Sequence, residues 1–217
     1  MQLNFKNPQV VVCVGKPKRG KSYAVKWAIL KNTLDKKIFK YGIVFTKTKF
    51  NKDFEYIPDE YVYEDYDPLI LQQYLDGIKQ QDKIVPSFII FDDIQGVIEA
   101  NDPVLTSLIA CHRHYKISIF FCFQYIYGHG STPVLRECTT YAILFNSKGD
   151  RTLRALYENF GQLFDSYNDF KEYFLACTSE PHTAMLYIQD LDHLEDNYLQ
   201  FKAPANMDKY KNLKLDF

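Results

Sequence analysis

Eight consecutive residues near the start of the chain have the types and spacing that bind a phosphate chain. Glycines permit a tight turn whose backbone N–H groups face an anion, and a helix that begins after the turn adds its positive end. A lysine at position 21 bridges the β- and γ-phosphates of a nucleotide, and the following serine supplies a hydroxyl to Mg²⁺. The pattern therefore predicts a site for ATP and Mg²⁺, formed by Gly15, Lys16, Pro17, Lys18, Arg19, Gly20, Lys21, Ser22 and the adjoining Tyr23.

A second group of polar residues follows two apolar segments further along the chain. Asp92 and Asp93 end the run Phe88–Phe91. One carboxylate at such a place holds the Mg²⁺ ion and the other activates water, so we assign the metal to Asp92 and the role of general base to Asp93. Asp93 as a simple helix cap is the alternative. Gln124 ends another apolar segment, where its amide senses the γ-phosphate or orients the attacking water, unless it is only a polar residue that closes a strand.

The elements that must position these residues alternate along the sequence. Short apolar runs at 10–14, 41–46, 87–91, 117–123, 141–146 and 183–188 predict strands, and helical patterns start at 21 and cover 67–80, 102–114, 150–160 and 161–180. Residues 47–67 are polar and indicate a loop or an edge decoration. Near-continuous apolar strands between helices predict an α/β fold: a mostly parallel central sheet of five or more strands with helices on both faces.

Length and composition favour one domain over residues 1–190, followed by a polar tail at 191–217 that we expect to be weakly ordered or to lie on a neighbour. The five cysteines form no Cys-x-x-Cys pair, which predicts a reducing compartment. The first residues lack the apolar core of a signal peptide, and no stretch is long enough for a membrane helix, so we expect a soluble intracellular protein. Cys111, His112, His114 and Cys122 lack the spacing of compact zinc-ligand pairs.

The order of these elements resembles a known family. A Walker A motif, a strand that ends in Asp-Asp, Arg113-His114-Tyr115-Lys116 before a strand that ends in Gln124, and Leu135-Arg136-Glu137-Cys138-Thr139 before another strand look like the poxvirus-type genome-packaging ATPases of the FtsK/HerA superfamily. The resemblance spans about residues 8–190, and the small size is similar to packaging ATPases of archaeal viruses and virophages. Many members have Asn where Cys138 stands, and Glu is common at the position of Asp93.

The resemblance implies a RecA/FtsK-like P-loop domain that works as a pentameric or hexameric ring. It implies a motor that translocates double-stranded DNA into a capsid, with a capsid or portal protein as partner, no membrane, and a location in the host-cell cytoplasm, a viral factory or the virion. An arginine of one subunit then reaches the γ-phosphate held by its neighbour. Arg113 is our first candidate and Arg136 the second, with pairing to a surface carboxylate as the alternative for each.

Other functions fit the sequence less well. A viral replication helicase of the Rep or superfamily-three type needs a strand tipped by Asn after the Walker B strand, a place that Asn146 could fill, and usually a further origin-binding domain. A GTPase needs the Asn-Lys-x-Asp motif, and Asn51-Lys52-Asp53-Phe54 departs from it. A nucleotide-regulated binding module without catalysis would not need the paired Asp92 and Asp93. The net charge of −1 does not exclude nucleic acid, because a translocase needs positive charge only where the strand passes.

Overall fold

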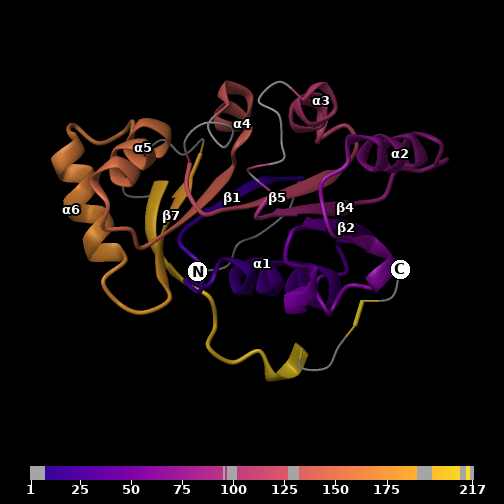
Figure 1. Cartoon of the computed structure of the whole chain (residues 1–217), viewed down its shortest axis with the longest axis horizontal. Coiled ribbons are helices and arrows are strands. Elements are labelled where there is room, and N and C mark those ends of the chain that lie inside the picture. Colours follow the sequence, from indigo (N-terminus) through magenta and orange to yellow (C-terminus); the bar gives the residue numbers. More distant parts are fainter. Residues whose placement is uncertain are drawn as a thin grey trace.

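The computed structural model describes residues 8–94, 96, 102–126, 132–189, 197–210 and 214–215. Its centre is an eight-stranded sheet with the order β3-β2-β4-β5-β1-β6-β7-β8 (Figure 1). The strands are β1 (Val10–Val14), β2 (Tyr41–Thr46), β3 (Val62–Tyr63), β4 (Ser87–Asp92), β5 (Ile117–Phe123), β6 (Tyr141–Phe145), β7 (Thr183–Ile188) and β8 (Tyr198–Lys202).

The first strand lies in the middle of the sheet and the strands around it run in the same direction. Val12 of β1 is opposite Phe121 of β5 on one side and Ala142 of β6 on the other, both in parallel pairing. All five residues of β1 are buried, as expected for a strand that is covered on both faces. Among the described strands, only β7 runs against its neighbours, pairing antiparallel with β6 on one side and with β8 on the other. The expected α/β fold with a mostly parallel sheet is confirmed.

Helices cover both faces of this sheet. One face carries α1 (Lys21–Leu30) and the π-helical turn η1 (Lys31–Asp35), together with the C-terminal segment (Figure 1). The other face carries five α-helices (Figure 1). They are α2 (Pro68–Lys79), α3 (Pro103–Cys111), α4 (Pro133–Cys138), α5 (Asp150–Phe160) and α6 (Tyr167–Cys177). Three short 3₁₀ turns, η2 (Lys49–Asn51), η3 (Asp59–Tyr61) and η5 (Asp208–Tyr210), complete the described elements.

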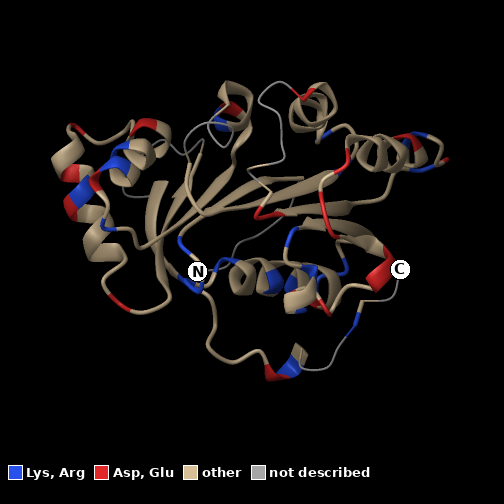
Figure 2. Ribbon diagram, viewed as in Figure 1, with Lys and Arg blue, Asp and Glu red and all other residues tan. Residues whose placement is uncertain are grey.

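Local sequence explains where several of these helices start. The Asp67 side chain accepts a hydrogen bond from Leu69 N, and Asp102 accepts from Val104 N and Leu105 N, so each caps the first turn of its helix. A proline follows each cap, where its missing N–H costs nothing. Figure 2 shows charged residues of both signs interspersed over helices and loops, with few on the strands.

Alternate residues of each strand contribute to two apolar cores. Val10, Val12 and Val14 pack with α2 to α6, whereas Val11 and Cys13 pack with α1 and the C-terminal segment. Because strand side chains alternate between faces, a continuous apolar run is needed to fill both cores. The buried strand β1 therefore carries the phosphate loop on a rigid base.

Several details differ from the sequence-based expectations. The expectation that the tail is weakly ordered is wrong for its described part, because Tyr198–Lys202 pairs with β7 and Tyr210 and Leu215 are buried in the core. The helix predicted over 102–114 ends at Cys111, since residues 112–116 turn into β5. The loop at 47–67 contains the edge strand β3, which fits the expected edge decoration.

Candidate active site

The phosphate loop links the buried end of β1 to the start of α1. Gly15 N donates to Phe123 O of the neighbouring strand, which holds the loop at the edge of the sheet. The Lys21 ammonium lies across the loop and donates to Gly15 O at 2.7 Å and to Lys16 O at 3.3 Å. Residues 16–19 are exposed and Lys21 and Ser22 are half-buried. The cationic side chains and the loop backbone are thus accessible to an anion.

The first turn of α1 differs from those of the other described α-helices. Its N-cap, Gly20, makes no side-chain cap, and its first turn contains no acidic residue. In α2, α3, α4 and α6 a side chain caps the first turn, and α5 has Asp150 there. The N–H groups at the start of α1 therefore remain available for a phosphate, which the helix dipole also favours.

Two glycines of the loop are required for different reasons. Gly20 has φ 109°, a conformation that side chains with a Cβ rarely adopt. A Cβ at Gly15 would lie 2.7 Å from Cβ of Phe145, the last residue of β6. Phe145 thus packs directly beneath the loop, and only glycine fits at position 15.

The Walker B strand brings Asp92 to the same edge of the sheet. Asp92 is 5% exposed, and Thr46 at the end of β2 donates to its Oδ2 at 3.2 Å. Burial raises the pKa of the Asp92 carboxyl to about 6, although the Thr46 hydroxyl and the charge of Lys21 lower it, and the charges of Asp93 and Asp53 raise it further. A carboxylate buried at this cost is stabilised by a nearby cation.

Asp93 and Gln124 contact one another. Gln124 Nε2 donates to Asp93 Oδ1 at 2.7 Å, across the adjacent ends of β4 and β5. Asp93 has φ 55°, in the left-handed region, so the chain turns sharply after β4 and directs this carboxylate differently from Asp92. No described helix starts at Asp93, since α3 begins at Pro103 with Asp102 as its cap. The contact brings the predicted base and the predicted sensor residue together.

The chemistry of the donor set fits Mg²⁺. This ion binds hard oxygen ligands and commonly takes one or two carboxylates while water and substrate phosphates complete its shell. The Ser22 hydroxyl, in the first turn of α1, and the Asp92 carboxylate, on the last residue of β4, are ligands of this type. The raised pKa of Asp92 is a further sign of a carboxyl group that favours a positive partner.

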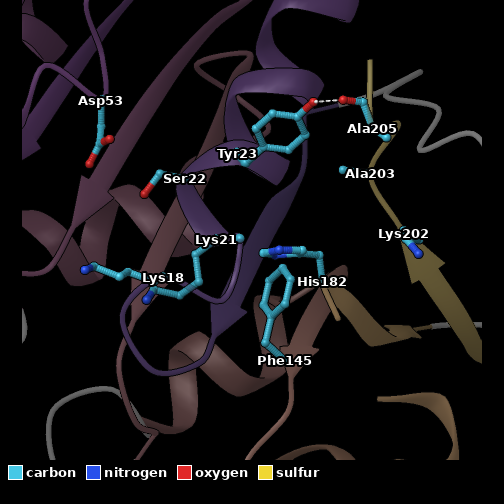
Figure 3. A pocket seen from close by; sticks show the side chains of 11 residues that line it. Lys18, Lys21, Ser22, Tyr23, Asp53, Phe145, His182, Lys202, Ala203 and Ala205 are labelled. Atoms are coloured by element: carbon cyan, nitrogen blue, oxygen red, sulfur yellow. Dashed lines mark hydrogen bonds between the residues drawn. The ribbon is translucent and has the colours of Figure 1, made fainter. Parts of the chain in front are cut away.

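A pocket of about 510 Å³ adjoins the phosphate loop. At one end it is lined by Lys18, Gly20, Lys21, Ser22 and Tyr23, all of which belong to the predicted nucleotide site. Asp53 points toward Ser22 from the loop after β2 (Figure 3). The remaining wall consists of Phe145, His182, Lys202, Ala203 and Ala205, none of which the sequence indicated.

Strand direction explains why these missed residues meet. Loops that follow parallel strands gather at one edge of a sheet, which is a signal that could have identified Asp53 after β2. β7 runs antiparallel, so its start lies beside the end of β6, where Phe145 pairs with Ala184. β8 reverses again, and Thr183 pairs with Lys202. The sequence does not reveal the direction of β7 and β8, so His182 and Lys202 could not be predicted as pocket residues.

The two candidate arginines lie at the opposite edge of the sheet. Arg113 belongs to the turn before β5, and Arg136 to α4, which precedes β6. Burial raises the pKa of the Cys138 thiol and Arg113 opposes that shift, which places Arg113 near the end of α4. Since the seven residues of β5 span roughly 20 Å at about 3.3 Å each, neither side chain reaches the phosphate loop of its own chain.

Asn146 and Arg154 make contacts that indicate other roles, and one further loop lies outside the residues that the structure describes. Asn146 Nδ2 donates to Thr178 O at 2.9 Å and to Thr178 Oγ1 at 3.0 Å. Arg154 pairs with Asp150 on the exposed face of α5. Within the ranges that the structure describes, no group of three or more His, Cys, Asp or Glu residues could hold a metal ion, and no helix is long and apolar enough to cross a bilayer. Tyr127 and His129 follow β5 in a Gly-rich loop whose rings could stack on nucleic acid, but residues 127–131 lie outside the described residues.

The fold is shared with solved structures of nucleotide-dependent machines. The genome packaging NTPase B204 from Sulfolobus turreted icosahedral virus 2, in complex with AMPPCP, gives a TM-score of 0.63 at 17% identity over 90% of this chain and 97% of that chain. The pCW3 conjugation coupling protein TcpA gives 0.65 at 9% identity over 93% and 62%, respectively. The cytoplasmic domain of the Thermomonospora curvata type VII secretion ATPase EccC gives 0.58 at 12% identity over 93% and 26%.

The sequence matches no protein-family model and has no significant match among curated proteins. At these low sequence identities, the similarity to the solved structures shows a shared fold and nothing more. At that level the expected mostly parallel α/β fold is confirmed, and the solved structures that share it include viral genome packaging NTPases.

Proposed function

We propose that this chain hydrolyses ATP and uses the energy to move double-stranded DNA into a virus capsid. The observation that carries the proposal is the meeting of three elements at one sheet edge: the phosphate loop after β1, Asp92 and Asp93 after β4, and Gln124 after β5. The similarity to the genome packaging NTPase of an archaeal virus over 97% of that chain supports the choice of DNA packaging.

The residues at this edge divide the chemistry among them. The N–H groups of the loop and the Lys21 ammonium bind the phosphates and stabilise the charge that develops during transfer. Ser22 and Asp92 hold Mg²⁺, which when bound neutralises charge on the β- and γ-phosphates. Asp93 accepts a proton from the attacking water, and Gln124, which donates to Asp93, orients that carboxylate.

The position of the arginines supports assembly into a ring. Arg113 and Arg136 lie too far from the phosphate loop to act within one chain, but an adjacent subunit can present its opposite edge to the site. A guanidinium in that position would stabilise the γ-phosphate and make hydrolysis depend on the neighbour. A pentameric or hexameric ring with a capsid or portal partner, in the host-cell cytoplasm or a viral factory, is part of the proposal.

The contacts of Asn146, the candidate sensor residue of the helicase alternative, favour a structural role for this side chain. Both donor contacts of Asn146 go to Thr178, a residue at the end of α6. This arrangement ties β6 to the segment before β7 and gives Asn146 a structural role.

ATP hydrolysis measured with and without DNA tests the proposed function. We expect long double-stranded DNA to stimulate turnover of the wild type and to have no effect on Lys21→Ala, which loses the ammonium group at the phosphates. Lys40→Ala, an exposed lysine before β2, is the matched control and should behave as wild type. Stimulation by single strands alone would favour a helicase, and equal rates with and without DNA would contradict a DNA motor.

A further inference from the structure

The C-terminal segment after β8 forms one wall of the pocket beside the phosphate loop. Lys202, Ala203 and Ala205 line this wall. The Tyr23 hydroxyl, on the first turn of α1, donates to Pro204 O at 2.8 Å. It also donates to Ala205 O at 3.2 Å (Figure 3). Further along, Tyr210 donates to Asp35 Oδ2 at 2.7 Å. The segment is therefore held by β8, by Tyr23 and by Asp35.

The order of the strands indicates which side of the pocket would hold the γ-phosphate and which side the nucleoside. Asp92, Asp93 and Gln124 end β4 and β5, on one side of β1, and mark the place of the γ-phosphate. The pocket extends to the other side of β1, toward β6, β7 and β8. Since the phosphates are fixed at the loop between the two sides, the nucleoside must lie toward β6 to β8.

The residues on that side suit a flat, largely apolar ligand group. His182 lies beside the Phe145 ring and faces the start of α1 (Figure 3). Its Nδ1 would lie 3.8 Å from a Cβ at Gly20, so the imidazole is next to the phosphate loop. His182 is exposed and has φ 60°, a turn conformation that directs its ring over the pocket. Ala203 and Ala205 opposite it have small side chains that leave room.

We propose that the nucleobase of the bound nucleoside triphosphate lies between His182 and the segment 202–205, and that Tyr23 holds this segment in place. The inference rests on the proposed ATP site and adds the part of the site that binds the base. Stacking on the imidazole and contact with the two alanines supply the affinity for the base. Tyr23 links the position of the C-terminal segment to the first turn of the phosphate-binding helix.

Binding of ATP and of inorganic tripolyphosphate, which has no base, separates the two parts of the site. Both ligands are titrated calorimetrically with Mg²⁺ into the full chain. We expect the wild type to bind ATP more tightly than tripolyphosphate. His182→Asn, which keeps a residue that tolerates positive φ, should weaken ATP binding roughly tenfold, as expected for loss of one stacking contact, and leave tripolyphosphate unchanged. Tyr23→Phe should weaken ATP binding severalfold with the same selectivity.

Tyr173→Phe is the matched control for Tyr23→Phe. Tyr173 is 38% exposed, as is Tyr23, and its hydroxyl also donates to a backbone carbonyl, Tyr198 O, at 2.8 Å. It lies on α6, away from the pocket, so this variant should bind both ligands as wild type does. A normal thermal melt for each variant verifies that it folds.

The outcomes distinguish failure of the inference from failure of the ATP site. If the wild type binds neither ligand, or if Lys21→Ala binds both as tightly as wild type does, the proposed ATP site is wrong. If Lys21→Ala weakens both ligands but the wild type binds ATP no better than tripolyphosphate, the base lies elsewhere. Equal weakening of both ligands by His182→Asn would likewise overturn the inference.

Discussion

At the scale of the residue, Asp92, which we propose as a ligand of Mg²⁺, is buried at a cost to the folded chain. In the unfolded state its pKa returns to the ordinary value of 3.8, whereas in the folded protein burial raises the pKa to about 6. Between these values the folded chain holds a proton that the unfolded chain has released, so stability falls as the pH rises through this range. Above about pH 6 the buried charge destabilises the metal-free protein by up to about 3 kcal/mol.

We therefore expect Asp92→Asn to be more stable than wild type at pH 7.5 in the presence of a chelator. The gain should shrink as the pH falls through about 6 toward 3, where Asp92 is protonated in both the folded and the unfolded wild type. Urea unfolding at several pH values measures it, with Asp82→Asn, an exposed carboxylate, as the control. A difference between Asp92→Asn and wild type that does not change with pH would refute this account. Mg²⁺ with ATP should stabilise wild type but not Asp92→Asn.

Asp93 has a different role, which a conservative change can isolate. Asp93→Asn keeps a side chain of the same shape beside Gln124, but the amide cannot accept a proton from water. We expect nucleotide binding within a few-fold of wild type and a loss of turnover of about 10²-fold or more, as is typical for general bases. Calorimetry and a phosphate-release assay measure the two effects. Normal turnover in this variant would assign the base to another carboxylate, and Asp53, which lines the pocket, would be the first to test.

At the scale of elements, periodicity and capping residues predicted the helices and strands that depend mainly on local sequence. The strand at Val10–Val14 and the helix at Asp150–Phe160 have the predicted bounds. Their signals are continuous apolar runs or helical spacing, which depend little on the rest of the chain. The edge strand β3 pairs through only two residues, and β8 buries only Tyr198 and Phe201 of its five residues, within a polar segment. Both segments form strands because they pair with a neighbouring strand, and no local sequence pattern predicts such pairing.

The same distinction applies to the candidate site. Its phosphate end was predicted because the loop and the Walker B carboxylates each have a local motif. The opposite end was missed because His182 and Lys202 meet only through the antiparallel pairing of β7 with β8. The Tyr23 contact with Pro204 joins residues 181 positions apart, and neither has a motif of its own.

The pairing of β2 with β4 contains a glycine that packing requires. Gly42 is opposite Phe88, and a Cβ at Gly42 would lie 2.5 Å from three atoms of the Phe88 ring. Phe88 is fully buried, so the ring has little room to move. We expect Gly42→Ala to destabilise the protein by about 1–3 kcal/mol through overpacking, measured by urea unfolding.

Gly77→Ala is the control for this effect of packing. Gly77 is exposed in α2 and a Cβ there meets nothing within 4 Å. The same substitution should stabilise the protein there by up to about 1 kcal/mol, through helix propensity. Combining Gly42→Ala with Phe88→Leu should cost less than the sum of the two single changes, because the smaller side chain relieves the contact. Strict additivity would show that Phe88 is not the cause.

For the whole molecule, the sheet separates the two edges that the proposed function uses. The pocket proposed for the nucleotide lies at the ends of the parallel strands, and Arg113 and Arg136 lie where β5 and β6 begin. Charged residues of both signs are interspersed along the ribbon (Figure 2), so a single chain has little reason to attract DNA at long range. Both features favour a function that appears only when several chains assemble, because a ring creates the arginine-to-phosphate contact and a shared channel at the same time.

An arginine that acts between subunits makes hydrolysis depend on assembly, so activity per chain should rise steeply with protein concentration. Mixing two inactive variants tests this directly. Lys21→Ala chains have an inactive pocket but retain Arg113, whereas Arg113→Ala chains have an intact pocket and lack the arginine. Neither variant alone should hydrolyse ATP. A mixture should recover part of the wild-type rate, because some interfaces then join an intact pocket to an intact arginine.

The control replaces the first partner with a chain that carries both Lys21→Ala and Arg113→Ala. This chain still assembles but has no arginine to donate, so mixing it with Arg113→Ala should restore nothing. Recovery in the first mixture and not in the second requires that the arginine act across an interface, since an arginine that served its own chain could never be rescued by a neighbour. If mixed oligomers form and the first mixture stays inactive, Arg113 is not that residue, and the same pair of mixtures with Arg136→Ala decides whether the second candidate at this edge takes the role.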